Sequence, residues 1–365
     1  MANGKSYDDP IFLAQGGDPL VVGQAFSDFV AAAKKSLHIA IYDFQLTGDS
    51  QALVVKALKD AAKRGVDVKI AYDHTKADTK KAKGGFTDTT PMKDTQGDPA
   101  KRGTQGFVTN NFPTTSKIQL MPIAGSHLMH NKYIIRDGAS ETASIWMGSA
   151  NFTDGAWGLQ ENNIIRIQSK ELASHYEQDF DDLWKSGNIL KTGLNDYASV
   201  QVDGKQVQVA FAPGEGSAAA SLFVDAIQGA GKTIYISTMV LSSGPILGAL
   251  NDYIEQGGKL IGIYDATQMK QIESAWKRVG SKKLAQWKVI KESLVGKTST
   301  PYSETAPHDY MHNKTLVTDN VVITGSFNLS ENAESNAENV LTLPFDDLVV
   351  AYKAYVKKIV RKYTT

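Results

Sequence analysis

Val66-Asp67-Val68-Lys69-Ile70-Ala71-Tyr72-Asp73 is a short run rich in β-formers, and it predicts a buried strand. The amphipathic stretch before it ends in a basic turn and a glycine at Arg64-Gly65, which predicts a helix. A second β-rich run, residues 37–44, lies before that helix and follows a helical pattern over residues 22–35. The alternation of helices and strands predicts an α/β fold with a mixed or parallel sheet.

The same order of elements returns later in the chain. Helical patterns over residues 222–228 and 247–254 alternate with β-rich runs over residues 233–238 and 259–265. The second run of each half ends in the same Tyr-Asp pair. We therefore expect an internal duplication of about half the chain, with one site between the two halves.

The boundary between the halves is predicted from a hairpin pattern. Residues 200–209 alternate apolar and polar side chains around Asp203-Gly204, which is typical of a β-hairpin. The region before this hairpin serves as the linker. We place the first half at residues 1–195 and the second at residues 196–365.

The composition excludes several classes of protein. The 365 residues are 42% hydrophobic and 21% charged, which is ordinary for a globular protein and excludes disorder. The formal net charge is zero, so the whole surface cannot be basic, although a local patch can be. The chain has no cysteine, which excludes disulfides, cysteine metal sites and a cysteine nucleophile.

Two copies of one polar pattern are the candidate chemistry. Each copy reads His-x-Lys-x4-Asp and is followed by Gly-Ser-x-Asn. An acid follows each asparagine at the same interval (151 to 161 and 328 to 338). The residues are His130, Lys132, Asp137, Ser149, Asn151 and Glu161 in the first copy, and His312, Lys314, Asp319, Ser326, Asn328 and Glu338 in the second. Two copies in one chain make chance an unsatisfactory explanation.

The spacing within each copy indicates which side chains share a face of the strand. Residues i and i+2 of a strand point to the same face, so each histidine shares a face with its lysine. Asp137 and Asp319 lie at odd intervals from the lysines, so we interpret both as structural. Two histidines, two lysines, two asparagines and two serines that converge would form a strong anion site for one phosphoryl group.

These motifs resemble those of the phospholipase D superfamily, which carries a duplicated HKD motif. The resemblance covers the whole chain in outline. It implies two similar α-β-α sandwich halves with mixed sheets and an active site at their interface. One departure is that the first copy has a longer connection between Asp137 and Gly148 than the second has between Asp319 and Gly325.

The resemblance also implies a metal-independent phosphodiesterase that works through a covalent phosphohistidine, with no cofactor. By this resemblance His130 is the nucleophile and His312 the acid and base. Lys132, Lys314, Asn151 and Asn328 would hold the non-bridging oxygens, with help from Ser149 and Ser326. Glu161 and Glu338 would accept hydrogen bonds from the imidazole nitrogens that lie away from phosphorus.

Two further histidines and one decoy motif need separate interpretation. His127 and His308 precede the motif histidines, and we expect them to contact substrate at the rim. A zinc pair is the alternative, but no third ligand repeats in both halves. The run 229–233 resembles a phosphate loop, but Ala226 stands where that loop needs glycine, and a helix precedes it where a strand should.

Two basic inserts bear on the substrate. Residues 76–102 hold seven basic residues against four Asp, and residues 270–297 hold eight against two Glu. Positive charge at the mouth suits a polyanion, so we predict a non-specific nuclease that hydrolyses DNA or RNA. The alternatives are a phospholipase D that hydrolyses or transphosphatidylates phospholipid headgroups, and an inactive scaffold that binds nucleic acid. Both motifs are intact, which argues against the scaffold.

The chain gives few signals about location. It has no run of 18 apolar residues, and its start lacks the apolar region of a signal peptide. We expect a soluble protein that is secreted or periplasmic after signal removal, with a cytoplasmic location also open. No obligate protein partner is implied, because both motif copies lie in one chain and a monomer suffices.

Overall fold

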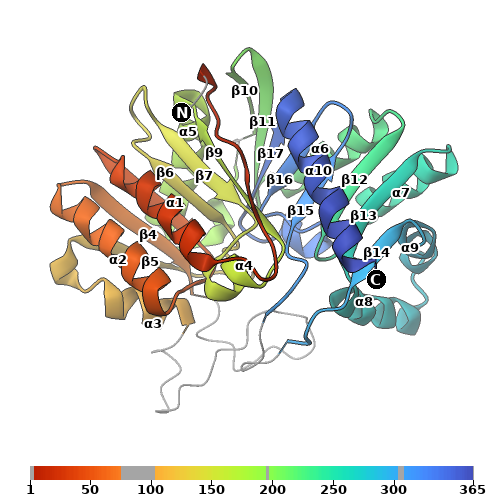
Figure 1. The fold of residues 1–365 in the computed structure, drawn as a ribbon, viewed down its shortest axis with the longest axis horizontal. Coiled ribbons are helices and arrows are strands. Elements are labelled where there is room, and N and C mark those ends of the chain that lie inside the picture. Colours follow the sequence, from red (N-terminus) through yellow and green to blue (C-terminus); the bar gives the residue numbers. More distant parts are fainter. Residues whose placement is uncertain (1–3, 75–102, 195–196, 303–307, 365) are drawn as a thin grey trace.

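The computed structural model describes residues 4–74, 103–194, 197–302 and 308–364. Two large sheets lie side by side, one in each half of the chain (Figure 1). Among the described residues, no helix combines the length and the apolar character needed to cross a bilayer.

The first half contains a seven-stranded mixed sheet. In spatial order the strands are β1 (Ile11–Leu13), β9 (Asn162–Gln168), β7 (Ser144–Gly148), β6 (Lys132–Arg136), β2 (Ser36–Ile41), β4 (Asp67–Asp73) and β5 (Ile118–Ile123). Strands β2, β4 and β5 are parallel, and the other pairings are antiparallel. Helices α1 (Pro19–Ala31) and α2 (Gly48–Lys63) cover one face of the sheet, and α5 (Lys170–Ser186) covers the other.

The second half repeats this plan with eight strands. Their order is β10 (Ala198–Val202), β11 (Lys205–Ala212), β17 (Glu338–Leu343), β16 (Val322–Gly325), β15 (Lys314–Val317), β12 (Thr233–Thr238), β13 (Lys259–Asp265) and β14 (Leu294–Lys297). Helices α6 (Gly216–Gln228) and α7 (Gly244–Glu255) cover one face, and α10 (Asp346–Tyr363) covers the other. The predicted fold of two similar α-β-α sandwich halves is confirmed.

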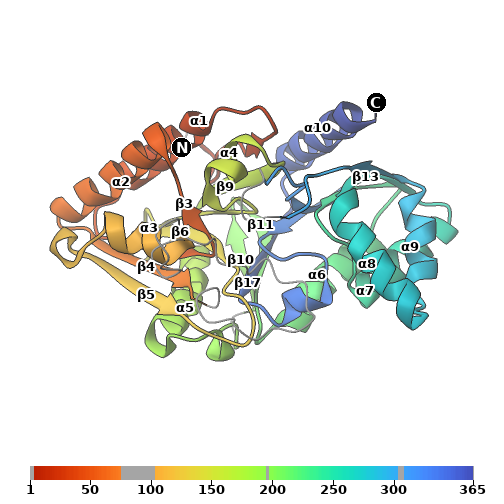
Figure 2. The same cartoon turned by 90° about the horizontal axis from the view of Figure 1, so that it is seen from below.

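Six further elements surround the two sheets. They are β3 (Phe44–Gln45), β8 (Phe152–Thr153), α3 (Gly103–Asn111), α4 (Asp154–Gly158), α8 (Ala266–Val279) and α9 (Lys283–Lys291). Three short 3-10 turns complete the described elements, at Thr114–Ser116, Ile189–Lys191 and Glu331–Glu334. In the view from below, β9, β11 and β17 lie between the helices of the two halves (Figure 2).

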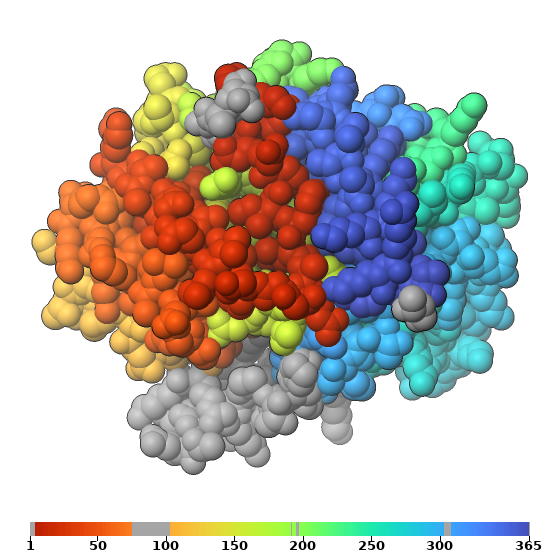
Figure 3. Space-filling view, in the orientation of Figure 1, coloured from red at the N-terminus to blue at the C-terminus, as the bar shows by residue number. Residues whose placement is uncertain are grey.

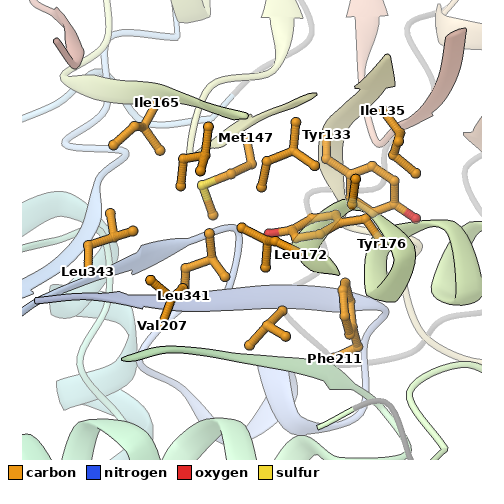
Figure 4. Packing of buried hydrophobic residues seen from close by; sticks show 14 of the residues in the cluster. Tyr133, Ile135, Met147, Ile165, Leu172, Tyr176, Val207, Phe211, Leu341 and Leu343 are labelled. Carbon is orange, nitrogen blue, oxygen red and sulfur yellow. The ribbon is translucent and has the colours of Figure 1, made fainter. Parts of the chain in front are cut away.

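One apolar core joins the two halves. Met147 and Ile165 of the first sheet face Leu341 and Leu343 of the second, and Tyr176 of α5 packs in the same cluster (Figure 4). All five side chains are buried. Such close packing leaves the facing strands little room to move. The side chains that they carry are therefore held at fixed distances from one another.

The N-terminal segment crosses to the second half and lies beside α10 (Figure 3). The ring of Phe12 stacks on Tyr355 at 4.2 Å between centroids, and the Tyr355 hydroxyl donates to the carbonyl of Leu13 at 3.1 Å. Tyr7 donates to Asp347 at the start of α10 at 2.8 Å. The N-terminal strand is therefore part of the contact between the halves.

Candidate active site

Each motif histidine stands just before a central strand of its sheet. His130 precedes β6 and His312 precedes β15. The backbone N–H of His130 donates to Ala337 O at 2.8 Å, and that of His312 donates to Glu161 O at 3.1 Å. Both acceptors belong to the opposite half, so each histidine is held by the residue just before β17 or β9 of the other half.

The imidazole contacts also cross between the halves. Nδ1 of His130 lies 2.8 Å from Oε2 of Glu338, and Nδ1 of His312 lies 3.0 Å from Oδ1 of Asn162. An amide oxygen only accepts, so Nδ1 of His312 carries a proton, and Nδ1 of His130 carries one whenever the Glu338 carboxyl is ionised. In the neutral ring Nε2 then has the lone pair, and this is the nitrogen that can meet phosphorus or a proton.

The expected contact between Glu161 and an imidazole is wrong, because Asn162 occupies that position. Ser149 N bonds Asn163 O, whereas Ser326 N bonds Asn339 O (149 to 163, but 326 to 339). The first copy thus has one extra residue before its last strand. Asn162 therefore matches Glu338, and Glu161 is displaced by one position toward the N-terminal segment.

The two serines lie behind the imidazole partners. Ser149 Oγ donates to Asn162 Oδ1 at 2.8 Å and accepts from Asn163 N at 3.0 Å. Ser326 hydrogen-bonds the Glu338 carboxyl and accepts from Asn339 N at 3.0 Å. A hydroxyl has one proton to donate, so these serines orient the imidazole partners and are not placed to donate to phosphoryl oxygens.

The glycine before each serine is required by close approach of two strands. A Cβ on Gly148 would lie 2.1 Å from Asn163 O, and one on Gly325 would lie 2.1 Å from Asn339 O. Both glycines pair directly with the strand that carries the imidazole partner. The Gly-Ser sequence therefore lets β7 and β16 approach β9 and β17 at the site.

Both motif lysines are buried at the same place. Lys132 is 1% exposed and Lys314 is fully buried, and each Nζ donates to the carbonyl of its own histidine at 2.5 Å. Both lysines act on His312 and on Glu338 electrostatically. The two ammonium groups therefore converge from the two halves onto one small volume.

The electrostatics make the two histidine pairs unequal. Burial, and then the charges of Lys314 and Lys132, lower the pKa of His312 well below its ordinary value. Burial raises the pKa of Glu338 to about 8, while Lys132 and hydrogen bonds from Ser326 and Asn336 oppose that rise. An anion between the lysines would oppose the lowering of the His312 pKa.

The motif asparagines have unused acceptors. Asn151 is buried and Asn328 is half-buried. Oδ1 of each lies away from solvent and has no hydrogen-bond partner in the described part of the chain. An unpartnered buried acceptor is costly, and phosphoryl oxygens cannot satisfy it because they only accept, so only the Nδ2 group of each asparagine could donate to a bound anion.

A family model described as "Cardiolipin synthase, PLD-like domain" matches residues 27–184 and 223–360, which include both motif copies. The chain belongs to the phospholipase D superfamily. It is therefore a phosphodiesterase-type enzyme of that superfamily. Among curated proteins, no relative matches at a significant level.

Two solved structures that match nearly the whole of this superfamily member share its fold. Phosphatidylserine synthase of Haemophilus influenzae Rd KW20 is 13% identical with a TM-score of 0.64, over 97% of this chain and 88% of its own. Polyphosphate kinase of Porphyromonas gingivalis is 10% identical with a TM-score of 0.54, over 96% of this chain and 50% of its own. Nuc of Salmonella typhimurium, a phospholipase D family member, is 23% identical with a TM-score of 0.34, over 43% of this chain and 94% of its own.

The aspartates of the two HKD motifs lie away from the phosphoryl site. The Asp137 carboxylate is buried and accepts from the backbone N–H groups of Lys34, Lys35 and Ser36, at 3.0, 2.6 and 3.1 Å. It holds the turn between α1 and β2. Asp319 instead lies at the surface, 3.2 Å from Nζ of Lys353 on α10.

The two rim histidines of this HKD protein differ in surroundings. His127 is exposed, whereas His308 is half-buried between the rings of Tyr302 and Tyr310, at 5.1 and 5.5 Å between centroids. His308 acts on His312 electrostatically, which places it on the His312 side of the site. No group of three or more His, Cys, Asp or Glu side chains within the described ranges could hold a metal ion.

The predicted basic inserts can be assessed only in part. The first, residues 76–102, lies outside the described residues. The second forms α8, α9 and β14, where Lys283 pairs with Glu331 and Lys291 lies 2.7 Å from Glu273. The remaining exposed basic residues are Lys270, Lys277, Arg278, Lys282 and Lys288, whereas Lys297 is buried.

Sequence reasoning missed a ladder of asparagines between the halves. Asn339 Nδ2 donates to Asn131 Oδ1 at 2.9 Å, and Asn163 Nδ2 donates to Asn313 Oδ1 at 2.8 Å. Asn131 and Asn313 are the middle residues of the two His-Asn-Lys sequences. Their repetition in both copies was the available signal.

Proposed function

We propose that this protein hydrolyses phosphodiesters of nucleic acids through a covalent phosphohistidine on His130, without a metal ion. The observation that carries the proposal is the pair of cross-half imidazole contacts beside two buried lysines. Every group that the reaction needs comes from one chain, so a monomer is sufficient.

In the first step, Nε2 of His130 attacks phosphorus and the bond from phosphorus to the leaving oxygen breaks. Protonated His312 gives its Nε2 proton to that oxygen. In the reactive form the Glu338 carboxyl is ionised, and the His130 Nδ1–H bonded to it stabilises the cationic ring that forms. Lys132 and Lys314 offset the charge on the non-bridging oxygens, and the Nδ2 groups of Asn151 and Asn328 would donate to them.

In the second step, a water oxygen attacks phosphorus and the bond from His130 Nε2 to phosphorus breaks. Neutral His312 takes the proton from water, so it returns to the protonated form. His312 donates a proton in the first step and accepts one in the second. An imidazole can do both, because its pKa lies near neutral pH and shifts with its surroundings. The bound phosphodiester brings the negative charge that raises the pKa of His312 from its low value in the empty site.

The unequal partners favour His130 as the nucleophile. A carboxylate partner increases the electron density of an imidazole and stabilises its positive form, whereas an amide partner does so less. His130 has Glu338 and His312 has Asn162. Nδ2 of Asn162 donates to Ala156 O at 3.1 Å and to Gln160 Oε1 at 3.2 Å, which fixes the amide oxygen toward His312.

The exposed basic residues of α8 and α9 support a nucleic acid as the substrate. Asp265 caps the N-terminus of α8, and its carboxylate also accepts from Met311 N at 3.0 Å. The basic helix thus starts at the edge of the sheet from which His312 enters the site. Phosphate contacts of this kind bind nucleic acid without regard to sequence.

Phospholipid is the second candidate substrate. Two names support a phospholipid substrate. The matching family model is described as a cardiolipin synthase domain, and one structure that matches over most of this chain is a phosphatidylserine synthase. A lipid substrate contains the same phosphodiester group, so the chemistry of the histidines does not distinguish the two.

One series of incubations tests the proposed function. Plasmid DNA, single-stranded DNA, phosphatidylcholine vesicles and bis(p-nitrophenyl) phosphate are each incubated with the protein in excess EDTA. We expect cleavage of DNA and of the nitrophenyl diester. Cleavage of vesicles with intact DNA would instead favour the phospholipid, and no cleavage of any substrate would contradict the proposed reaction.

A further inference from the structure

The displaced carboxylate of Glu161 lies at the centre of a second polar cluster. The Glu161 side chain is fully buried, and its Oε1 accepts from the hydroxyl of Tyr363, from Nζ of Lys362 at 3.1 Å and from the backbone N–H of Gln15 at 3.3 Å. These donors come from the last turn of α10 and from the N-terminal segment. Three distant parts of the chain therefore meet at one carboxylate.

The donors are also tied to each other. Lys362 Nζ donates to Gln15 O at 3.0 Å, and the Tyr363 hydroxyl lies 3.2 Å from Gln15 Oε1. The ammonium of Lys297, a residue that is 2% exposed, lies 5.0 Å from the centre of the Tyr363 ring. Burial lowers the pKa of Lys297, and the charge of Glu161 opposes that shift. Glu161 is therefore held by hydrogen bonds and by charge.

Glu161 and its neighbour make two consecutive contacts with His312. The carbonyl of Glu161 accepts from the His312 backbone N–H at 3.1 Å, and the Asn162 side chain accepts from the His312 ring at 3.0 Å. Glu161 N also donates to Tyr310 O at 3.2 Å. Movement of residues 161–162 would therefore displace both the backbone and the ring of His312.

Among the residues that the structure describes, the first histidine has no matching cluster. Ala337 occupies the position that corresponds to Glu161, and its carbonyl accepts from His130 N at 2.8 Å. Ile123 corresponds to Lys297, because each pairs with the aspartate that ends the neighbouring strand, Asp73 or Asp265. The polar cluster is therefore specific to the His312 side.

We infer that Lys362 and Tyr363, with Gln15, position His312 through Glu161 and Asn162. This inference rests on the proposed function, in which His312 serves as acid and base. The end of α10 then controls the proton-transfer step, although it does not contact substrate. Weakening the cluster should impair steps that need His312 and spare the attack by His130.

Single-turnover rates, measured with enzyme in excess, test whether the cluster affects only the steps that need His312. A dinucleotide has an alkoxide leaving group that needs a proton from His312, whereas bis(p-nitrophenyl) phosphate has a leaving group that needs little help. In Tyr363→Phe and in Glu161→Gln, we expect the dinucleotide rate to fall about ten-fold, because modest misplacement of a catalytic group has effects of this order or larger. The nitrophenyl rate should stay within about two-fold of wild type.

Lys353→Gln is the matched control, because Lys353 lies on the same helix but pairs with Asp319 at the surface. It should change neither rate. An equal fall of both rates in Tyr363→Phe and Glu161→Gln, or no fall in either, overturns the inference. The proposed function is judged separately, by intact-mass detection of a phosphoryl adduct on His130 in the wild-type protein.

Discussion

Glu338, at the start of the last strand of the second half, lies 2.8 Å from Nδ1 of His130 in the first half. The matching histidine, His312, has the amide of Asn162 in place of a carboxylate. Two motifs that look equivalent in sequence thus give two different imidazoles. The nucleophile and the acid are distinguished by their partners, and each partner comes from the opposite half.

If His130 is the nucleophile and His312 the acid and base, alanine variants of the two histidines should behave differently. With bis(p-nitrophenyl) phosphate, His312→Ala still allows His130 to attack, because nitrophenolate needs little acid help. Water is then poorly activated, so about one equivalent of nitrophenol should be released before turnover stalls. Intact-mass spectrometry under non-acidic conditions should find the added mass on the peptide that holds His130. His130→Ala should form no adduct, and an adduct on His312 in that variant would reverse the roles.

Asn162→Asp should change the pH profile. A new carboxylate 3.0 Å from Nδ1 of His312 would raise the pKa of that histidine, by about one to three units for a close opposite charge. The second step needs neutral His312, so its acidic limb should move to higher pH. Steady-state rates with the nitrophenyl diester between pH 4 and 9 measure this limb. An unchanged profile would mean that His312 is not the base.

The raised pKa of Glu338 predicts a pH-dependent stability. The folded protein keeps a proton on this carboxyl up to about pH 8, whereas the unfolded chain loses it near pH 4.5. Its contribution is thus fully present below about pH 4.5 and is lost as pH rises through about 8. We expect the free energy of unfolding of wild type, relative to Glu338→Gln, to fall by up to a few kcal/mol over that range. Denaturant titrations at several pH values measure it, and a constant difference contradicts it.

The fold and the chemistry of the motifs were accessible from sequence because they rest on local patterns. Strand periodicity and the repeated Tyr-Asp ends predicted the duplicated α/β halves. The partner of His312 was not accessible, because it depends on backbone register. Glu161 and Glu338 lie at equal intervals from Asn151 and Asn328, yet one extra residue before β9 brings Asn162 to the ring.

The serines show the same limit. Ser149 and Ser326 stand in the right motif, but only the fold shows that their single protons are used on the imidazole partners. The cluster around Glu161 was also hidden, because Gln15, Lys297 and Tyr363 are far apart in the chain. Nothing in their local sequence indicates that they meet.

Activity should persist without divalent metal. Lys132 and Lys314 supply two buried positive charges where a metal-dependent enzyme would use ions. We expect the rate of nitrophenyl release in excess EDTA to match that in buffer alone. Loss of turnover in EDTA that added Mg²⁺ or Zn²⁺ restores would contradict the proposed mechanism. Lys132→Met should lower turnover strongly in both conditions, which controls for the assay.

The exposed face of α8 predicts salt-dependent binding of nucleic acid. Lys277→Glu with Arg278→Glu reverses two positive charges in the last turn of α8, whereas Lys56→Glu with Lys63→Glu makes the same change on α2, in the other half. We expect the α8 pair to weaken DNA binding and to reduce the slope of log affinity against log salt by about one for each phosphate that the protein no longer neutralises. The α2 pair should have a much smaller effect.

Turnover of bis(p-nitrophenyl) phosphate should be unchanged in both, because that substrate reaches only the phosphoryl site. If the α8 pair slows the small substrate as much as it weakens DNA binding, these residues act in folding or catalysis. If DNA binding is unaffected, α8 is not part of the nucleic-acid path.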